Sequence, residues 1–379
     1  MPLSDVLFQD AAQERLQRAL RSDRVPHAYL FTGPTGVGKE MLALRLAAVL
    51  LCERPRAIDA PGCGGDGAVS WRDACGECTD CRLLVAGTHP DFHRIHRTLN
   101  KHHPDAKVQR RKAIQLSVDV VRHFLIQKIG LMPSRGRAKV FVVSEAERMS
   151  PGAQNALLKT LEEPPDHSYL ILVATGEDAL LPTTRSRCQH VVFRRLPIEF
   201  VAQQLAGGHG VSPASARFLA ELSQGSLGTS LRFAEANLYE RSVDVLRTLQ
   251  AASRDPLQSG KVLLDMAKGF AVLFKEQDDE EAADTNAARA AQTMVLAVVS
   301  TILRDIHRAA VGLAPVALPD EASISELAGQ TTVEAVRKAV QAIGRAEYEI
   351  SRSGNTSLIF DSVGIELGRG LSGGGARAP

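Results

Sequence analysis

A glycine-rich loop between an apolar segment and a helical one is the feature that most constrains how this chain folds. Residues 31–46 read FTGPTGVGKEMLALRL, so that Gly33, Gly36, Gly38 and Lys39 follow the G-x-x-x-x-G-K pattern of a phosphate-binding loop. Such a loop lies between a strand and a helix, because backbone amides at the helix N-terminus hold the phosphate. The sequence therefore predicts an α/β domain built around this loop.

Short apolar runs alternate with helical patterns through the first half of the chain, which is typical of a parallel sheet covered by helices. We predict strands at residues 28–32, 91–95, 139–144, 169–175 and 190–194. We predict helices at residues 39–51, 114–126 and 151–161. The third helix follows Ser150, a favourable N-cap, and has Pro151 in its first turn.

The pattern changes after residue 195, where the strand-like runs stop and helical periodicity continues to about residue 370. More than one domain is expected for 379 residues, because a single hydrophobic core rarely grows that large. We expect a P-loop-type domain at residues 1–195 with a metal module at 52–81, a small helical domain at 196–240, a larger helical domain at 241–370 and a disordered tail at 371–379.

Charge and hydropathy limit the classes of function. A formal net charge of +2 gives no bulk attraction to nucleic acid, so a DNA contact needs a local patch. The basic segment at residues 101–112 is either such a patch or a solvated loop. No apolar run approaches the ~20 residues that span a bilayer, and no secretory leader pattern is present. We therefore expect a cytoplasmic protein.

Two positions depart from the pattern of an ATP-hydrolysing enzyme. A Ser or Thr normally follows the loop lysine and binds magnesium, but this chain has Glu40. A second strand normally ends in an Asp that holds the metal, followed by a Glu that orients water. The strand in KVFVVSEAERM instead carries Ser144 at the Asp position, with Glu145 after it. The loss of both metal-binding side chains indicates a site that does not hydrolyse ATP.

A cysteine triplet, CGECTDC, places Cys75, Cys78 and Cys81 at two-residue spacing. This spacing favours a zinc site, and tetrahedral zinc needs a fourth ligand. Cys52 and Cys63 are the candidates that precede the triplet. Four thiolates leave no open coordination position, so the zinc would have a structural role.

Four segments, HAYLFTGPTGVGK, THPDF, NALLKTLEEPP and LLPTTRSRCQ, resemble in sequence and order the bacterial clamp-loader subunits of the AAA+ superfamily. The resemblance covers roughly residues 5–235 and is strongest to the delta-prime family of DNA polymerase III. It implies a Walker-type domain, a small helical lid and a helical collar through which five subunits form an open ring. It also implies that Cys52, rather than Cys63, is the first zinc ligand.

The same resemblance assigns roles to two further residues. TTRSRC carries Arg187 where the family presents an arginine finger to ATP bound by a neighbouring subunit. GSLGTSL resembles the lid motif of the motor subunits, but Gly228 replaces the arginine that contacts the γ-phosphate.

Together these features predict a non-hydrolysing subunit of the DNA polymerase III clamp loader. It would hold structural zinc, bind nucleotide weakly or not at all, and help to place the sliding clamp on primed DNA. Its partners would be gamma/tau-like ATPase and delta-like subunits in a hetero-oligomeric ring. One alternative is an active gamma/tau-type ATPase. The other is a zinc-stabilised assembly module with no part in the ATP cycle, and Arg187 is the residue that discriminates it.

Overall fold

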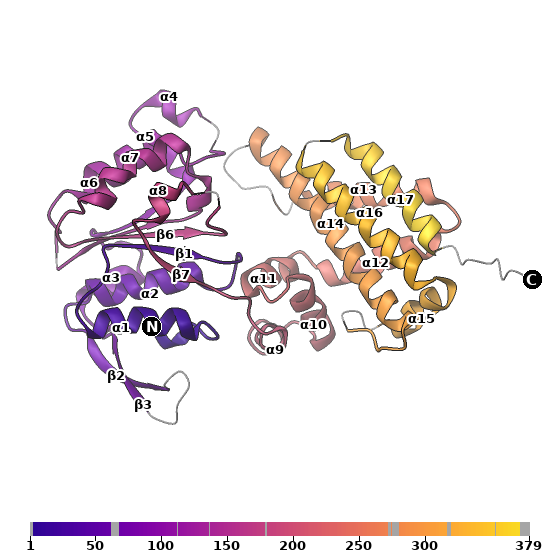
Figure 1. Cartoon of the computed structure of the whole chain (residues 1–379), viewed down its shortest axis with the longest axis horizontal. Coiled ribbons are helices and arrows are strands. Elements are labelled where there is room, and N and C mark those ends of the chain that lie inside the picture. The colour runs from indigo at the N-terminus through magenta and orange to yellow at the C-terminus, as the bar shows by residue number, and fades with distance from the viewer. Residues whose placement is uncertain are drawn as a thin grey trace, which may run out of the picture. The chain divides into compact units, whose positions relative to one another are not determined.

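The computed structural model describes residues 3–61, 68–111, 113–135, 137–178, 180–271, 274, 280–316, 320–352 and 354–371. The chain forms two compact units, Met1–Arg195 and Leu196–Pro379. The first combines a sheet with helices, and the second is built of helices (Figure 1).

The first unit contains the strands β1 (Ala28–Thr32), β2 (Arg56–Pro61), β3 (Ala68–Asp73), β4 (Phe92–Ile95), β5 (Lys139–Val143), β6 (Ser168–Ala174) and β7 (Gln189–Val192). Its α-helices are α1 (Asp10–Arg21), α2 (Lys39–Leu51), α3 (Thr79–Val85), α4 (Ala106–Gln109), α5 (Val118–Val121), α6 (Gln127–Ile129), α7 (Pro151–Glu162) and α8 (Pro182–Arg185). Short 3-10 helices cover Leu3–Asp5, Arg97–His102 and Ala146–Arg148.

A five-stranded parallel sheet in the order β4-β5-β6-β1-β7 forms the centre of this unit. Strand β1 lies between β6 and β7, so the direction of the strand order reverses there. In open α/β sheets a ligand crevice forms outside the carboxyl ends of the strands at such a point. The glycine loop follows β1 and therefore lies at this edge.

Side chains of the central strands alternate between two hydrophobic cores, one on each face of the sheet. In β1, Tyr29 and Phe31 belong to the core that includes α1 and α2, whereas Ala28 and Leu30 belong to the core that includes α5 and α7. Figure 1 shows α1 to α3 on one side of the sheet and α5 to α8 on the other. Burial on both faces explains why the strands read as continuous apolar runs.

The predicted parallel strands are confirmed, each with its ends within two residues of the expected positions. The predicted helix at 39–51 is α2, and the helix predicted after Ser150 is α7. The Ser150 side chain accepts a hydrogen bond from the Ala153 amide at 3.2 Å, as an N-cap does.

The prediction of a helix at residues 114–126 is wrong at both ends. The helical segment begins at Val118 with α5, passes through a π-helical turn at Arg122–Ile126 and ends with α6. Ser117 sets the start, because its side chain accepts a hydrogen bond from the Val120 amide. Ile114, the first residue of the predicted helix, is 47% exposed and lies outside it.

An unpredicted antiparallel hairpin, β2 with β3, precedes the cysteine triplet. The side chain of Gln17 in α1 donates to the carbonyl oxygen of Arg72 and accepts from its amide, both at 2.9 Å. These two bonds attach the hairpin to the rest of the unit. The alternative zinc ligand, Cys63, lies outside the described residues.

The second unit contains α9 (Ile198–His209), α10 (Pro213–Leu222), α11 (Leu227–Glu235), α12 (Leu238–Ala252), α13 (Pro256–Ala271), α14 (Glu280–Ala310), α15 (Glu321–Gln330), α16 (Val333–Ser351) and α17 (Thr356–Leu371). One hydrophobic core includes residues from α9 through α17, so the division of this unit at residue 240 stays a prediction. Residues 372–379 of the expected tail lie outside the described residues.

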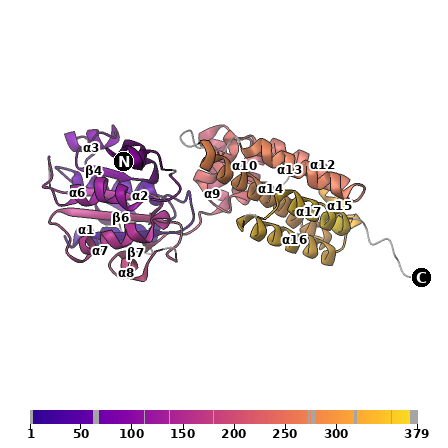
Figure 2. The ribbon, with the colours of Figure 1, turned by 90° about the horizontal axis from the view of Figure 1, so that it is seen from above.

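Helices α13 and α17 pack closely through glycines. A Cβ atom on Gly364 would lie 2.1 Å from the carbonyl oxygen of Pro256 and 2.8 Å from the amide nitrogen of Gly260. A Cβ on Gly260 would lie 2.3 Å from the carbonyl oxygen of Phe360. Figures 1 and 2 show α13, α14, α16 and α17 side by side in this unit.

No helix within the described ranges is both long and apolar enough to cross a membrane.

Substitution Gly364→Ala should destabilise the second unit, because the added methyl group collides with backbone atoms that cannot rotate away. Overpacking of this kind typically costs about 1–3 kcal/mol. Gly344→Ala is the matched control, since Gly344 is an exposed position in α16 with nothing near the added Cβ. It should be neutral or stabilising. Urea unfolding followed by far-UV circular dichroism measures both, and equal midpoints for the two variants would contradict the close packing.

Candidate functional site

The glycine loop between β1 and α2 has a backbone that only glycine adopts readily. Gly33, Gly36 and Gly38 have φ angles of +146°, +73° and +102°. Gly33 also lies against the residue that follows β7, because a Cβ there would come within 2.4 Å of the carbonyl oxygen of Phe193. The loop is therefore a tight, closely packed turn at the start of α2, as the phosphate-loop pattern predicts.

Lys39, the first residue of α2, has its side chain within the loop. It is 6% exposed, and its ammonium group donates hydrogen bonds to the carbonyl oxygens of Gly33 and Pro34. Burial lowers the pKa of Lys39. The loop thus holds a positive charge close to its own backbone.

Glu40 and Ser144, the two positions that depart from the hydrolytic pattern, are bonded to the same arginine. Arg94 donates from Nη2 to the Glu40 carboxylate and from Nε to the Ser144 hydroxyl, the latter at 3.3 Å. Arg94 lies in β4, and Ser144 follows the neighbouring parallel strand β5. No sequence motif marks Arg94, because only the pairing of β4 with β5 brings it to the loop.

Glu145, at the position that orients water in hydrolytic enzymes, is bonded to two arginines. Its carboxylate lies 3.0 Å from Nε of Arg97 and 3.2 Å from Nε of Arg148. Its backbone is in the left-handed region, with φ of +51°. Both arginines compete with a water molecule for the oxygens of this carboxylate, so Glu145 is poorly placed to orient one.

The residues around the loop do not fit the magnesium ion that the phosphate-loop pattern implies. Magnesium prefers oxygen ligands in octahedral geometry, normally a loop hydroxyl and a strand-end carboxylate together with phosphate oxygens. Glu40 provides no hydroxyl, Ser144 provides no carboxylate, and a guanidinium group is bonded to both.

Arg187 lies after α8, in the connection between β6 and β7. Its guanidinium pairs with the carboxylate of Glu162 at the end of α7 and donates to the carbonyl oxygen of Thr183 at 2.8 Å. The side chain is 33% exposed. Arg187 is thus positioned by contacts within its own unit while part of it reaches the surface.

Gly228, which replaces the arginine of the lid motif, is the second residue of α11 in the other unit. It has no side chain that could contact a phosphate.

Cys52, Cys75, Cys78 and Cys81 form a cluster in which all four Sγ atoms lie within 4.8 Å of one another. Cys52 is the C-cap of α2, Cys75 follows β3, and Cys78 is the N-cap of α3, which contains Cys81. The Sγ of Cys52 lies 3.5 Å from that of Cys75 and 3.9 Å from that of Cys78. Cys75 and Cys81 are 4.0 Å apart at Sγ.

These separations fit one tetrahedral metal ion. Zinc with Zn–S bonds of about 2.3 Å places its four sulfurs about 3.8 Å apart, whereas a disulfide bond needs about 2.05 Å. The sulfurs also accept amide hydrogen bonds, from Cys75 to Cys52, from Cys78 to Cys75 and from Cys81 to Cys78, at 3.3–3.4 Å. A backbone hydrogen bond from Glu77 is the largest of the influences that lower the pKa of Cys75, to about 6. Burial raises the pKa of Cys52 and of Cys81.

Buried polar contacts attach the cysteine cluster to the sheet. Asp80 in α3 is 2% exposed, accepts a hydrogen bond from Nε of Arg135 at 2.8 Å and lies 3.4 Å from Nε2 of His89. The Asp91 carboxylate accepts from the amides of Ser134 and Arg135 at 2.7 and 2.9 Å. The segment THPD (residues 88–91) therefore has a structural role, because it holds α3 and the segment that precedes β5.

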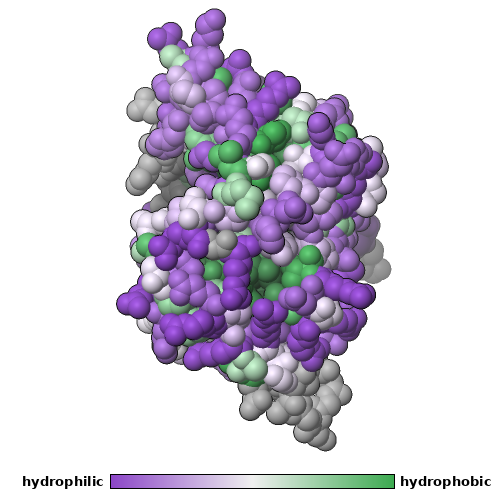
Figure 3. Space-filling view, turned by 90° about the vertical axis from the view of Figure 1, so that its left-hand side faces the viewer, coloured by the Kyte–Doolittle hydropathy of each residue, from purple (hydrophilic) through white to green (hydrophobic). Residues whose placement is uncertain are grey.

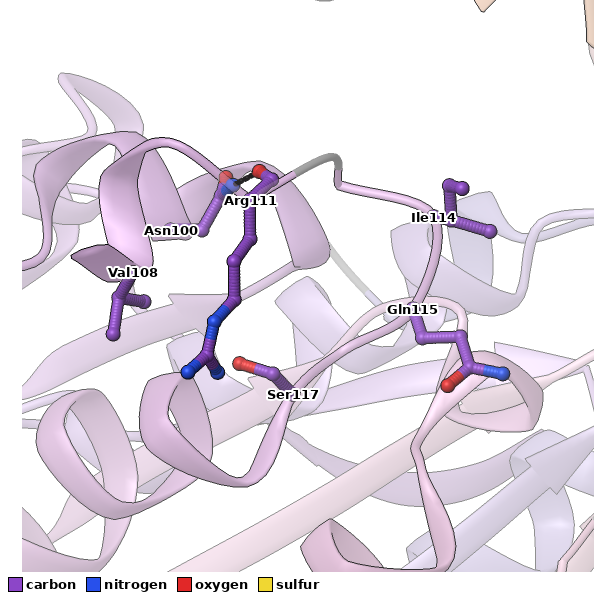
Figure 4. A pocket seen from close by; sticks show the side chains of 6 residues that line it. All are labelled: Asn100, Val108, Arg111, Ile114, Gln115 and Ser117. Carbon is purple, nitrogen blue, oxygen red and sulfur yellow. Dashed lines mark hydrogen bonds between the residues drawn. The ribbon is translucent and has the colours of Figure 1, made fainter. Parts of the chain in front are cut away.

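A shallow pocket of about 400 Å³ lies next to the basic segment at residues 101–112. Its lining comprises Asn100, Val108, Arg111, Ile114, Gln115 and Ser117, shown in Figure 4. Within it the Asn100 side chain donates to the carbonyl oxygen of Arg111, whose guanidinium pairs with Asp119 at 2.6 Å. Charged and polar side chains cover most of the face in Figure 3, with smaller apolar patches between them.

Comparisons with known proteins agree on one family. A family model described as DNA polymerase III, delta subunit, matches residues 8–197. DNA polymerase III subunit delta' of Pseudomonas aeruginosa is 41% identical over 165 residues, which are 43% of this chain and 41% of that protein. DNA polymerase III subunit delta' of Bacillus subtilis is 26% identical over 370 residues, 96% of this chain and 97% of that protein.

The chain is also similar to a tau subunit. DNA polymerase III subunit tau of Escherichia coli is 31% identical over 333 residues, 86% of this chain and 46% of that protein. The match thus spans less than half the length of the Pseudomonas aeruginosa and Escherichia coli relatives.

Proposed function

Because this chain belongs to the clamp-loader delta-prime family of DNA polymerase III, we propose that it is a clamp-loader subunit that does not hydrolyse ATP itself. It joins gamma/tau-like ATPase subunits and a delta-like subunit in a hetero-oligomeric ring in the cytoplasm. The assembled ring places the sliding clamp on primed DNA. In this proposal α9 to α11 form the lid and α12 to α17 form the collar through which the ring assembles.

The observation that carries the proposal is the bonding of Glu40 and Ser144 to one arginine. Both side chains that would hold a catalytic magnesium are replaced, and both replacements are engaged with Arg94. Glu145 is engaged with two further arginines. The second candidate function, an active gamma/tau-type ATPase, has the similarity to tau in its favour, but it requires the chemistry that these residues have lost.

Gly33, Gly36, Gly38 and Lys39 are kept in this proposal as a scaffold that binds nucleotide weakly or not at all. Lys39 supports this role, because its ammonium group is already bonded to two carbonyl oxygens of the loop. A phosphate group would have to replace those contacts before it could bind the lysine.

Arg187 is the residue through which the subunit acts on ATP, in trans, at the site of its neighbour. A guanidinium group can stabilise the charge that develops on a transferring phosphoryl group. Its partner Glu162 is half exposed, and exposed ion pairs contribute only about 0–1 kcal/mol, so a phosphate can replace Glu162 at little cost. The assembly-module alternative gives Arg187 no such part.

Zinc is the metal that best suits the cysteine cluster. Cys52, Cys75, Cys78 and Cys81 would hold it, and four sulfur ligands leave no position for water or substrate. The ion would therefore supply no chemistry. It would join the end of α2 to α3, two elements far apart in sequence, and so stabilise the first unit.

The purified chain should contain one zinc ion, measured by elemental analysis. Replacing any one of Cys52, Cys75, Cys78 or Cys81 by Ser should remove the ion and lower the melting temperature, because binding of a structural zinc is coupled to folding. Cys188→Ser is the control and should keep the zinc, since Cys188 is not part of the cluster. A purified protein without zinc would refute the assignment of a zinc site. Loss of zinc from Cys63→Ser but not from Cys52→Ser would show that Cys63, not Cys52, is the fourth ligand.

Substitution Arg187→Ala should leave the chain folded, zinc-loaded and able to enter the assembled loader. That loader should lose hydrolysis at one neighbouring ATP site and load clamps more slowly, by a factor on the order of 10 or more, because an arginine finger is worth about 10³–10⁵ at its own site. Steady-state ATP turnover and a clamp-loading assay, both with clamp and primed DNA, measure the effect.

Two variants serve as controls for this experiment. Arg185→Ala removes an arginine of similar exposure from the same short segment, and it should have little effect. Glu162→Gln removes the partner of Arg187 and should not slow the loader. If the loader that contains Arg187→Ala hydrolyses ATP and loads clamps at the wild-type rate, Arg187 is not an arginine finger, and the assembly-module alternative is favoured.

A further inference from the structure

We propose that the Arg94 guanidinium is a fixed cation that takes the place of a divalent metal at the phosphate loop and keeps such a metal out. The proposal rests on the proposed function, because it explains why a subunit of this family has a phosphate loop without metal chemistry. It begins from a contact set that the sequence did not reveal, one guanidinium group bonded to residues 40 and 144.

Three elements of the fold bring these side chains together. Glu40 is in the first turn of α2, directly after the loop. Arg94 lies in β4 one residue before the strand ends, and Ser144 lies one residue after the end of β5. The two strands are parallel neighbours, and the Ser144 amide donates to the carbonyl oxygen of Ile95 at 2.9 Å. The side chains therefore meet at the carboxyl edge of the sheet.

The guanidinium group suits this place by its shape and by its charge. Its planar fork presents several donors at once, so that one group bonds a carboxylate and a hydroxyl together. An arginine is not deprotonated in proteins, so this positive charge is permanent. In hydrolytic relatives of the phosphate loop, the residues at these two positions share a magnesium ion. Here they share Arg94.

A divalent ion would meet two obstacles at this place. It would have to displace Arg94 from the Glu40 carboxylate, although this step alone costs little, because the two side chains are 57% and 45% exposed and an exposed ion pair contributes only about 0–1 kcal/mol. It would also lie beside a like charge, which disfavours binding. The neighbouring carboxylate of Glu145 is paired with Arg97 and Arg148 and cannot replace Glu40 without breaking those pairs.

Binding of Mn²⁺ in the presence of ADP tests the proposal, with water-proton relaxation as the measurement. Relaxation is enhanced when the ion enters a slowly tumbling protein complex. Wild-type chain should give no enhancement beyond that of Mn²⁺ and ADP alone. Arg94→Gln should give a saturable enhancement at one ion per chain, at least tenfold tighter than any wild-type binding. Circular dichroism and zinc content check that each variant is folded.

Three further variants make the interpretation specific. Arg94→Gln combined with Glu40→Gln should lose the gain, because the released carboxylate is the ligand. Arg94→Lys should exclude Mn²⁺ as wild type does, because it keeps the charge. Arg18→Gln removes an exposed, ion-paired arginine elsewhere in the first unit and should behave as wild type.

The proposal is overturned if folded Arg94→Gln gains no Mn²⁺ binding, if Arg94→Lys gains as much as Arg94→Gln, or if the wild-type chain already binds the ion through Glu40. None of these results bears on whether Arg187 acts in trans. Conversely, an inactive finger in the assembled loader would refute the action of Arg187 in trans and leave the Mn²⁺ measurements standing. The two failures are therefore distinguishable.

Discussion

Burial of both faces of one parallel sheet is the constraint on which the first unit depends. Because β1 is covered on both sides, its position between β6 and β7 is fixed, and the glycine loop that follows it opens at the carboxyl edge. The same edge receives Arg94 from β4 and Ser144 from the end of β5. The sheet thus brings together residues separated by tens of positions in sequence. For this reason the glycine loop, Arg94 and the side chains of Glu40 and Ser144 form one site.

The elements with strong local patterns could be predicted from sequence. Strand β1 and helix α2 match their predicted bounds, because an apolar run, three glycines and a strongly apolar helical segment leave few alternatives. The helix predicted from residue 114 failed because Ser117 offers a better N-cap than any earlier residue. The hairpin β2 and β3 was missed, since its sequence, RAIDAP and AVSWRD, lacks clear alternation of apolar and polar residues.

The candidate site was predictable only in part. Residues that belong to a local sequence motif could be recognised, whereas residues that only the tertiary fold brings together could not. Glu40 and Ser144 stand out because a motif defines what should be there. The residues alone left Cys52 and Cys63 open as the fourth ligand, the family resemblance favoured Cys52, and the structure places Cys52 with the triplet. Arg94 could not be assigned at all, because its role depends on which strand lies beside β5. Its contacts with Glu40 and Ser144 are the basis of our proposal that the site keeps a cation in place of a metal.

Phosphate release by the isolated chain, measured with magnesium and ATP, tests the central claim most directly. The account predicts no release above that of a Lys39→Ala control prepared in the same way, because the residues that would hold the metal and orient water are bonded to arginines. Magnesium-dependent turnover that survives purification and disappears in Lys39→Ala would contradict it. The chain would then be an ATPase of the gamma/tau type.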